Sequence, residues 1–275
     1  MSSRLDKRFA DLKRENRAGL VAYVMASDPD LETSFEILRG LPAAGADVIE
    51  LGFPFSDPMA DGPSIQKAAQ RALHAGGSLR GTLDLAARFR KEDQTTPLIL
   101  MGYANPIEQM SYERFADAAS KAGVDGAIIV DLPPEEDAPL RSTLAEKDIA
   151  IIRLATPTTD EKRLPKVLDG VSGFLYYVAV AGVTGANAAT SENVRNAVAR
   201  LKRSTNLPIA VGFGVREPNA ARAIAQTADA VVVGSAFVDE IAAGAPQDAA
   251  ERVLRKVKQL SEAVRTAREL EGTLA

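Results

Sequence analysis

Two carboxyl residues, Glu50 and Asp61, stand close together in the sequence at positions where they could work as an acid and a base. Glu50 belongs to the short apolar run 47–51, which predicts a strand, so its carboxyl group is expected at the mouth of an apolar interior. Removal from water disfavours the charged form and raises the pKa of a carboxyl group. Asp61 follows in a segment rich in Pro and Gly, where we expect solvent to keep it ionised. Two carboxyls with pKa values pushed apart are typical of acid–base catalysis.

Each carboxyl also has a purely structural explanation. A Glu at the end of a strand can form an ion pair with an arginine, which also perturbs its pKa. An Asp before Gly62 and Pro63 can simply form a turn. The choice depends on what else the sequence places near these two residues.

The composition excludes several classes of protein. The chain has 275 residues, of which 46% are hydrophobic, so it can form a single domain, residues 1–275, around one large core. A net charge of -4 without a basic face gives no support for nucleic-acid binding. The absence of cysteine excludes disulfides, thiolate ligands and a thiol nucleophile. The charged start lacks a signal core and no apolar run reaches a membrane span, so we expect a cytoplasmic protein without a membrane partner.

Eight short apolar runs recur along the chain at intervals of about thirty residues. Continuous runs without polar alternation are typical of parallel strands that are covered on both faces. Helical patterns lie between them, and this alternation favours a closed (βα)8 TIM barrel over an open sheet. The runs are Leu20 to Met25, Val48 to Leu51, Leu98 to Met101, Ala127 to Val130, Ala150 to Leu154, Phe174 to Val180, Ile209 to Val211 and Ala230 to Val233.

Two additions to a plain barrel are expected. Residues 1–15 place Leu5, Phe9 and Leu12 on one face of an extra N-terminal helix, which could close the bottom of the barrel. The segment 52–93 is an insertion after strand 2 and carries the loop that contains Asp61.

Three further helical signals lie in the second half of the chain. One helix is expected to begin at Ser191, and Thr158 with Glu161 matches a capping box for another. A long final helix is predicted by the spacing of its apolar residues, which are Val253, Val257, Leu260 and Val264.

Glycine clusters follow the last three expected strands, at 182–185, 212–215 and 234–236. In such barrels the loops after the seventh and eighth strands, backed by a helix N-terminus, commonly bind phosphate. Ser235 would add a hydroxyl at the helix start. The glycines could instead close tight turns, and Gly182 and Gly185 could be hinges of a mobile lid.

Other chemistries lack the residues they need. The only histidine, His74, falls in a helical stretch, so a metal site built on histidines is out of reach. No lysine stands at a strand end to form a Schiff base, and no nucleotide-binding motif is present. What remains is a phosphate-anchored substrate acted on by carboxyls, helped by Tyr176, Tyr177 or Tyr103. If a carbon–carbon bond is broken, the substrate itself must take up the electrons.

Five segments resemble the tryptophan synthase alpha subunit, and the similarity runs from about Phe9 through the final helix. The resemblance implies a TIM barrel that cleaves indole-3-glycerol phosphate into indole and glyceraldehyde 3-phosphate without a cofactor. The indole ring, once protonated at C3, would take up the electrons. The segments are ELGFPFSDPMADGPSIQKA (50–68), MGYANP (101–106), DLPPEE (131–136), GVTGA (182–186) and VGFGV (211–215).

The resemblance also implies roles for individual residues. Glu50 would move protons to C3 and from the glycerol hydroxyl, and Asp61 would accept the indole N–H and stabilise the positive charge. Tyr176 would line the site, and Thr184 would be the lid residue that closes on Asp61. Tyr103 and Leu100 would line the indole pocket, and the phosphate contacts would be Gly185, Phe213, Gly214, Gly234 and Ser235.

The family further implies a beta subunit as partner, docked over the loops 53–62, 105–111 and 132–136. The sequence departs from the commonest pattern at Ser27, often a Gly, at Val130, often a Pro, and in the run that ends at Val180. Both carboxyls are intact. Two alternatives stay open: another phosphate-anchored barrel, such as a sugar-phosphate isomerase or indole-glycerol-phosphate synthase, and a non-catalytic subunit that only activates a partner.

Overall fold

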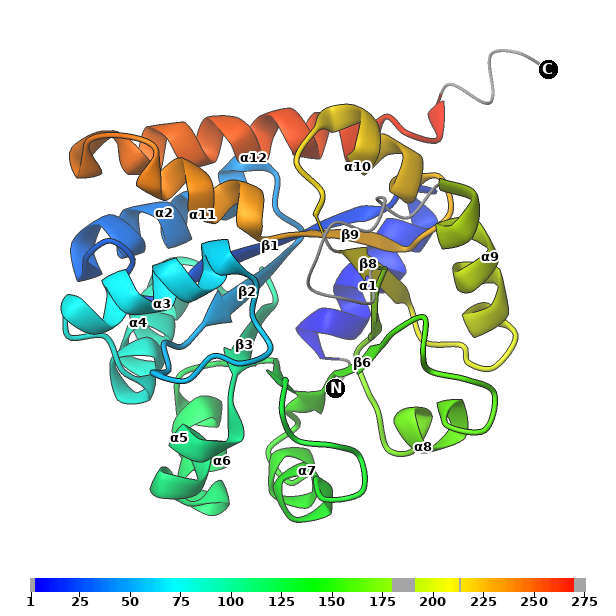
Figure 1. Cartoon of the computed structure of the whole chain (residues 1–275), viewed down its shortest axis with the longest axis horizontal. Helices are drawn as coiled ribbons and strands as arrows, with labels where there is room; N and C mark the ends of the chain where they lie inside the picture. Colours follow the sequence, from blue (N-terminus) through cyan, green and yellow to red (C-terminus); the bar gives the residue numbers. More distant parts are fainter. Residues whose placement is uncertain (1–2, 180–190, 213, 270–275) are drawn as a thin grey trace.

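A closed ring of parallel strands forms the centre of the molecule (Figure 1). The structure is a computed structural model that describes residues 3–179, 191–212 and 214–269. The strand order is β5-β4-β3-β2-β1-β9-β8-β7-β6. The strands are β1 (Gly19–Met25), β2 (Val48–Gly52), β3 (Leu98–Gly102), β4 (Gly126–Ile129), β5 (Ala150–Ile151), β6 (Arg153–Ala155), β7 (Leu175–Val178), β8 (Ile209–Gly212) and β9 (Ala230–Val233).

The ring closes because β5 and β6 are two halves of one stretch, separated only by Ile152. The first half pairs with β4 and the second half pairs with β7. The backbone N–H of Ile152 itself donates to Ala127 O at 2.9 Å. The eight predicted strands are therefore confirmed, with the fifth divided at one residue, and the architecture is the parallel α/β barrel expected from the sequence.

Helices cover the outside of the ring in Figure 1. The predicted insertion after the second strand is confirmed, since two helices, α3 and α4, separate β2 from β3. A second helix pair, α5 and α6, follows β3 and was not expected. The helices are α1 (Arg4–Arg14), α2 (Leu31–Ala44), α3 (Pro63–His74), α4 (Leu79–Glu92), α5 (Ala104–Met110), α6 (Tyr112–Lys121), α7 (Ala138–Ala145), α8 (Leu164–Leu168), α9 (Ser191–Lys202), α10 (Pro218–Ala225), α11 (Ser235–Ala242) and α12 (Ala249–Arg265), with a 3-10 turn η1 (Pro246–Asp248) before α12.

Two helix predictions are confirmed and one is wrong. Helix α9 begins at Ser191, and the four apolar residues predicted for the final helix are buried in α12. Thr158 and Glu161 form no capping box, because α8 starts only at Leu164. Instead, Asp160 Oδ1 accepts the backbone N–H groups of Lys162 and Arg163, at 3.1 and 2.7 Å. The spacing of Thr158 and Glu161 fits a helix start, but the side chain of Asp160 forms a turn before the helix begins.

Strand side chains alternate between the barrel interior and the helix layer, as the period of a strand requires. Tyr23 on β1 is level with Glu50 on β2, which is level with Ile99 on β3, and the interior cluster includes Ile99. Leu51 and Leu100 are also level with each other, but they belong to the cluster between sheet and helices. Strand register therefore decides which residues reach the interior.

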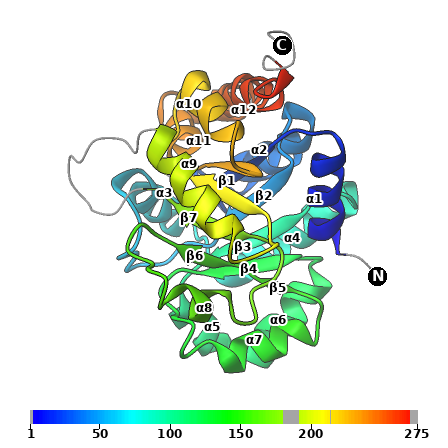
Figure 2. The same cartoon turned by 90° about the vertical axis from the view of Figure 1, so that its right-hand side faces the viewer.

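The N-terminal helix closes the bottom of the barrel, as predicted. Leu5, Phe9 and Leu12 are buried against side chains from inside the ring, and the rings of Phe9 and Phe174 lie 5.5 Å apart. In Figure 2, α1 and α3 lie at opposite ends of the barrel. The bottom is thus filled by apolar side chains, which leaves the other end for a site.

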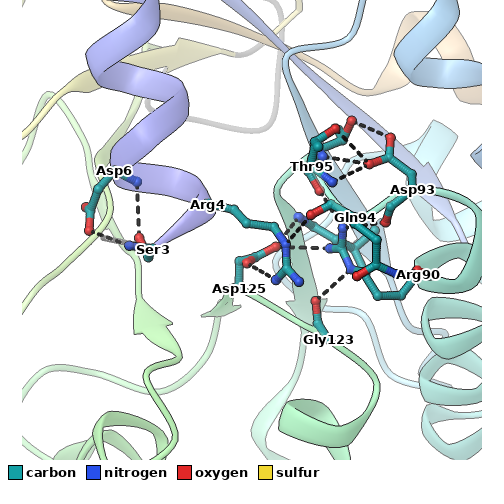
Figure 3. Close-up of polar contacts among 11 residues, drawn as sticks. Ser3, Arg4, Asp6, Arg90, Asp93, Gln94, Thr95, Gly123 and Asp125 are labelled. Carbon is teal, nitrogen blue, oxygen red and sulfur yellow. Dashed lines mark hydrogen bonds and ion pairs between the residues drawn. The ribbon is translucent and has the colours of Figure 1, made fainter. Parts of the chain in front are cut away.

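A buried carboxylate fastens this helix to the barrel (Figure 3). Asp125, directly before β4, accepts from Arg4 Nη1 at 2.8 Å, from Arg90 Nη2 at 3.1 Å and from the backbone N–H of Leu98 at 2.8 Å. Asp47 and Asp229 stand at the same place before β2 and β9, and each also accepts a backbone N–H from the preceding strand. The starts of these three strands are therefore stabilised by the same kind of hydrogen bond, from a backbone N–H of the preceding strand to an aspartate carboxylate.

Candidate active site

A cavity of about 460 Å³ opens at the carboxyl ends of the strands. Its size suits a small organic substrate. Six of the predicted site residues line it together: Glu50, Asp61, Tyr176, Gly214, Gly234 and Ser235. Residues that are more than 180 positions apart in the sequence thus meet in one place.

Glu50 projects from β2 into the cavity and is only 1% exposed. Neither carboxyl oxygen has a hydrogen-bond partner among the described residues. Burial, reinforced by the nearby charge of Asp61, raises the pKa of Glu50 to about 8. The ion pair with an arginine that could have explained this residue is not formed in the described part of the chain. Glu50 therefore carries a proton at neutral pH and can donate it.

Asp61 lies in the loop between β2 and α3, where its backbone is held on both sides. Its N–H donates to Pro58 O at 3.1 Å, and Gln66 Nε2 donates to its carbonyl oxygen at 2.9 Å. Burial raises the pKa of Asp61 to about 6, and the Tyr103 hydroxyl opposes that rise. Solvent therefore stabilises the ionised form of Asp61 less than we expected from the sequence. The predicted order still holds, because Asp61 loses its proton about two pH units before Glu50.

Two tyrosines face the carboxyls. Tyr176 on β7 lines the cavity, and burial together with the charge of Glu50 holds its pKa well above the usual range. Tyr23 on β1 lines it as well, and burial together with the charges of Asp61 and Glu50 raises its pKa too. Sequence reasoning missed Tyr23. Alternation along β1 indicates that Tyr23 shares a face with Val21 and Met25, but its position level with Glu50 depends on the register of β1 with β2, and Gly52 leaves space for its hydroxyl.

Tyr103 supports the site from behind. It is 2% exposed, and its ring lies 5.2 Å from the ring of Phe55. Its hydroxyl accepts the backbone N–H of Ala60 at 3.1 Å. Tyr103 is not among the residues that line the cavity, so it holds the Asp61 loop in place where the resemblance implied a contact with indole.

Leu100 does not reach the cavity, which corrects the sequence prediction by one residue. Its side chain is fully buried in the layer between sheet and helices. Met101, the next residue on β3, lines the cavity instead. Successive strand residues point to opposite faces, so a shift by one position reverses the side.

The part of the cavity that is lined by Gly214, Gly234 and Ser235 has the features of an anion site. Helix α11 begins at Ser235, and its first internal hydrogen bonds run from the N–H groups of Phe237 and Val238 to Gly234 O. The N–H groups of the first turn lie before these bonds, where the helix dipole favours negative charge. Gly214 faces open space with φ +70, a conformation that favours glycine. Thr184, Gly185 and Phe213 lie outside the described residues.

Other features of the described residues bear on the remaining expectations. No group of three His, Cys, Asp or Glu residues in this part of the chain could hold a metal ion. His74 ends α3 on the surface, with Nδ1 at 2.8 Å from Gln70 O. No described helix combines the length and apolar character needed to cross a membrane.

The departures from the family pattern affect the site differently. Ser27 has φ +65, so the glycine often found there would fit its backbone more easily, and its N–H donates to Ser34 Oγ at 3.0 Å. Val130 lines the cavity. Val180 lies outside the described residues.

Together, the barrel and the cavity define a class of protein. A parallel (βα)8 barrel that has two carboxyls and a helix N-terminus in one cavity at its carboxyl end is typical of enzymes that act on phosphorylated substrates. Comparison with known proteins gives the family. Residues 9–269 match the model of the tryptophan synthase alpha chain, and this chain belongs to that family. It is a lyase, and its reaction in tryptophan biosynthesis is the cleavage of indole-3-glycerol phosphate.

Individual relatives cover almost the whole chain. The tryptophan synthase alpha chain of Caulobacter sp. (strain K31) is 61% identical over 267 residues, which are 96% of this chain and 97% of the relative. That of Phenylobacterium zucineum is 58% identical over 97% of each chain. Among solved structures, tryptophan synthase subunit alpha from Legionella pneumophila has a TM-score of 0.90 and 37% identity, covering 96% of this chain and 99% of its own. A chain of Mycobacterium tuberculosis tryptophan synthase has a TM-score of 0.87 and 33% identity, with the same coverage.

Proposed function

We propose that Glu50 is the acid and base of the cleavage, that Asp61 holds the indole N–H, and that the α11 end of the cavity holds the phosphate. The observation that carries this proposal is the state of Glu50. A carboxyl group that is buried without a hydrogen-bond partner in the described residues, with a pKa of about 8, is poised to give and take a proton. Asp61, with a pKa of about 6, supplies a negative charge in the same cavity.

The reaction needs two proton transfers and no external electron acceptor. Protonated Glu50 gives its proton to C3 of the indole ring, and the ring nitrogen takes on the positive charge. The carboxylate of Asp61 stabilises that charge by accepting the N–H. Glu50, now ionised, takes the proton of the hydroxyl on the adjacent glycerol carbon. The bond between C3 and that carbon breaks, its electrons return to the ring, and the products are indole and an aldehyde. Glu50 is again protonated.

The rest of the cavity would position the substrate. Met101, Val130 and Leu154 offer an apolar surface for the ring, and Tyr176 covers it from β7. Binding the phosphate at the opposite end would fix the glycerol chain, which makes the proton transfers effectively intramolecular. The resemblance to the family supports Phe213 and Gly185 as further phosphate contacts and Thr184 as the lid residue.

Indole release from indole-3-glycerol phosphate tests this assignment. We expect Glu50→Gln to reduce kcat by at least about 100-fold, since an amide can neither give nor take the proton. Asp61→Asn should cost less, because a neutral amide still accepts a hydrogen bond. Glu262→Gln, at an exposed position of α12, is the matched control and should behave as the wild type. Wild-type turnover by Glu50→Gln would remove the proposed role of Glu50.

We further propose that a tryptophan synthase beta subunit docks over the loops 53–62, 105–111 and 132–136. Relatives include chains from structures of the Mycobacterium tuberculosis tryptophan synthase. Among the described residues Met59 is the most exposed large apolar side chain, at 77%, and it lies two residues before Asp61. This exposed side chain lies in the first of the three loops, which makes it the position at which to test docking.

Calorimetric titration with a purified beta subunit tests the docking surface. Met59→Asp should weaken binding at least tenfold, while Leu31→Asp, an exposed apolar position on α2, should leave it unchanged. Indole release measured with and without the beta subunit shows whether docking also changes turnover. Equal binding by Met59→Asp and the wild type would move the interface away from this loop.

A further inference from the structure

The cavity is lined by one basic side chain, Arg216, among the described residues. It follows Gly214 and Val215 in the loop between β8 and α10, and these two residues line the cavity beside it. Gly234 and Ser235 line the same cavity. Arg216 therefore lines the same cavity as the start of α11, where backbone N–H groups can bind an anion.

Arg216 is held by a contact that it can give up. Its Nη1 donates to Asp239 Oδ2 at 2.6 Å, and the two side chains are 52% and 41% exposed. An ion pair this exposed contributes little free energy, because water solvates both groups well. Asp239 lies in α11, one turn after Ser235, so the pair joins the loop between β8 and α10 to the helix that begins at the anion site.

Charge balance gives Arg216 a function that the backbone cannot perform. A phosphate monoester carries close to two negative charges at neutral pH. It would enter a cavity that also contains ionised Asp61 and the carboxyl of Glu50. Backbone N–H groups donate hydrogen bonds but carry no net charge. A guanidinium supplies a full positive charge and a planar set of donors that matches phosphate oxygens.

We propose that Arg216 is a specificity-determining residue for the phosphate of the substrate. In the free protein it pairs with Asp239, and on binding it turns to the phosphate, so that Asp239 competes with the substrate for the same guanidinium. This inference rests on the proposed function for the position of the phosphate. It does not depend on the roles of Glu50 and Asp61.

Substitutions of Arg216 and Asp239 should have opposite effects on substrate binding. This difference separates recognition of the phosphate from simple stabilisation of the local structure. Arg216→Gln should raise KM for indole-3-glycerol phosphate roughly five- to tenfold, with a smaller change in kcat. Arg216→Lys should restore part of the loss, since it keeps the charge but not the planar donors. Asp239→Asn removes the same ion pair but frees Arg216, so KM should stay the same or fall. Arg255→Gln, which breaks an exposed pair with Glu251 on α12, is the matched control and should leave KM unchanged.

A second probe, inorganic phosphate, makes the result independent of turnover. Its dissociation constant, measured by calorimetry at constant ionic strength, should rise in Arg216→Gln and not in Asp239→Asn. Equal effects of Arg216→Gln and Asp239→Asn on KM and on phosphate binding would show that the pair only stabilises the loops and would overturn the inference. If the wild type released no indole but bound phosphate through Arg216, the proposed function would fail and the inference would stand.

Discussion

The hydroxyl group of Tyr103 accepts the backbone N–H of Ala60 at 3.1 Å, and Ala60 is the residue directly before Asp61. Tyr103 follows β3, whereas Ala60 belongs to the loop after β2. The hydrogen bond therefore ties the loop that carries one carboxyl to the neighbouring strand end. The same hydroxyl lowers the pKa of Asp61, against the larger effect of burial.

Replacing Tyr103 by Phe keeps the aromatic ring but removes the hydrogen bond to the Ala60 N–H. We expect kcat/KM for indole release to fall about tenfold, because one hydrogen bond is lost and the carboxyl of Asp61 is less well placed. The pKa of Asp61 should rise, since the hydroxyl no longer favours its ionised form. Steady-state kinetics from pH 5 to pH 8 measure both effects. Tyr112→Phe, which removes an exposed hydroxyl bonded to Glu108, is the control and should change neither. An unchanged acid limb in Tyr103→Phe would contradict the assigned contact.

The two carboxyls predict a bell-shaped dependence of kcat/KM on pH. Below a pKa of about 6, Asp61 is protonated and cannot stabilise the positive charge on the ring. Above a pKa of about 8, Glu50 has lost the proton that it must donate. Activity should therefore be highest near pH 7. The alkaline limb is the sharper test, because the phosphate of the substrate also titrates near pH 6. Phosphate binding measured over the same pH range corrects for that contribution, and constant activity from pH 7 to pH 9.5 would contradict the role of Glu50.

The raised pKa of Glu50 also predicts that the residue lowers stability above acidic pH. In the unfolded chain its carboxyl ionises near the ordinary value of 4.5, whereas in the folded protein it stays protonated up to about 8. The free energy of unfolding should therefore fall as the pH rises from about 4.5 to 8 and then level off. Gln does not titrate, so Glu50→Gln should be more stable than the wild type by a few kcal/mol at pH 8.5.

Thermal unfolding of both proteins at pH 5.5, 7 and 8.5 tests this expectation. The difference in Tm between Glu50→Gln and the wild type should widen with pH. Glu262→Gln, at an exposed site, should show no such trend. A difference that stays constant with pH would mean that the carboxyl is not held protonated in the folded protein.

The strands could be predicted because a barrel buries both faces of each strand. Their sequences are continuous apolar runs, and those runs, such as 48–51, mark the elements directly. Helix α5 was missed because Pro106 stands inside it, although proline is tolerated in the first turn. The break at Ile152 comes from the way the ring closes, which no local pattern records.

The candidate site could be predicted in part. Motifs located Glu50 and Asp61, and the structure places both in one cavity. Deciding between Leu100 and Met101 requires the register of β3 against its neighbours, and the support that Tyr103 gives to Ala60 depends on packing between two loops. No pattern in the sequence indicates a role for Arg216, because that role depends on the position of α11, which lies some twenty residues further along the chain.

At the other end of the barrel, Asp125 should contribute strongly to the stability of the fold. It is 5% exposed, and it accepts hydrogen bonds from Arg4, Arg90 and the Leu98 backbone. Asp125→Ala leaves the buried guanidinium of Arg90 without its carboxylate, which should lower the free energy of unfolding by roughly 3 kcal/mol.

Asp229→Ala is the matched variant, since Asp229 accepts from the Ile209 backbone in the same way. Its side chain is 31% exposed and its partner Lys202 is 43% exposed, so water replaces the lost contact and the expected cost is about 1 kcal/mol. Urea unfolding measures both values, and kcat of each folded variant should match the wild type because both sites lie far from the cavity. Equal losses for the two variants would show that the shared backbone contact, and not the buried arginine, sets the contribution of these aspartates.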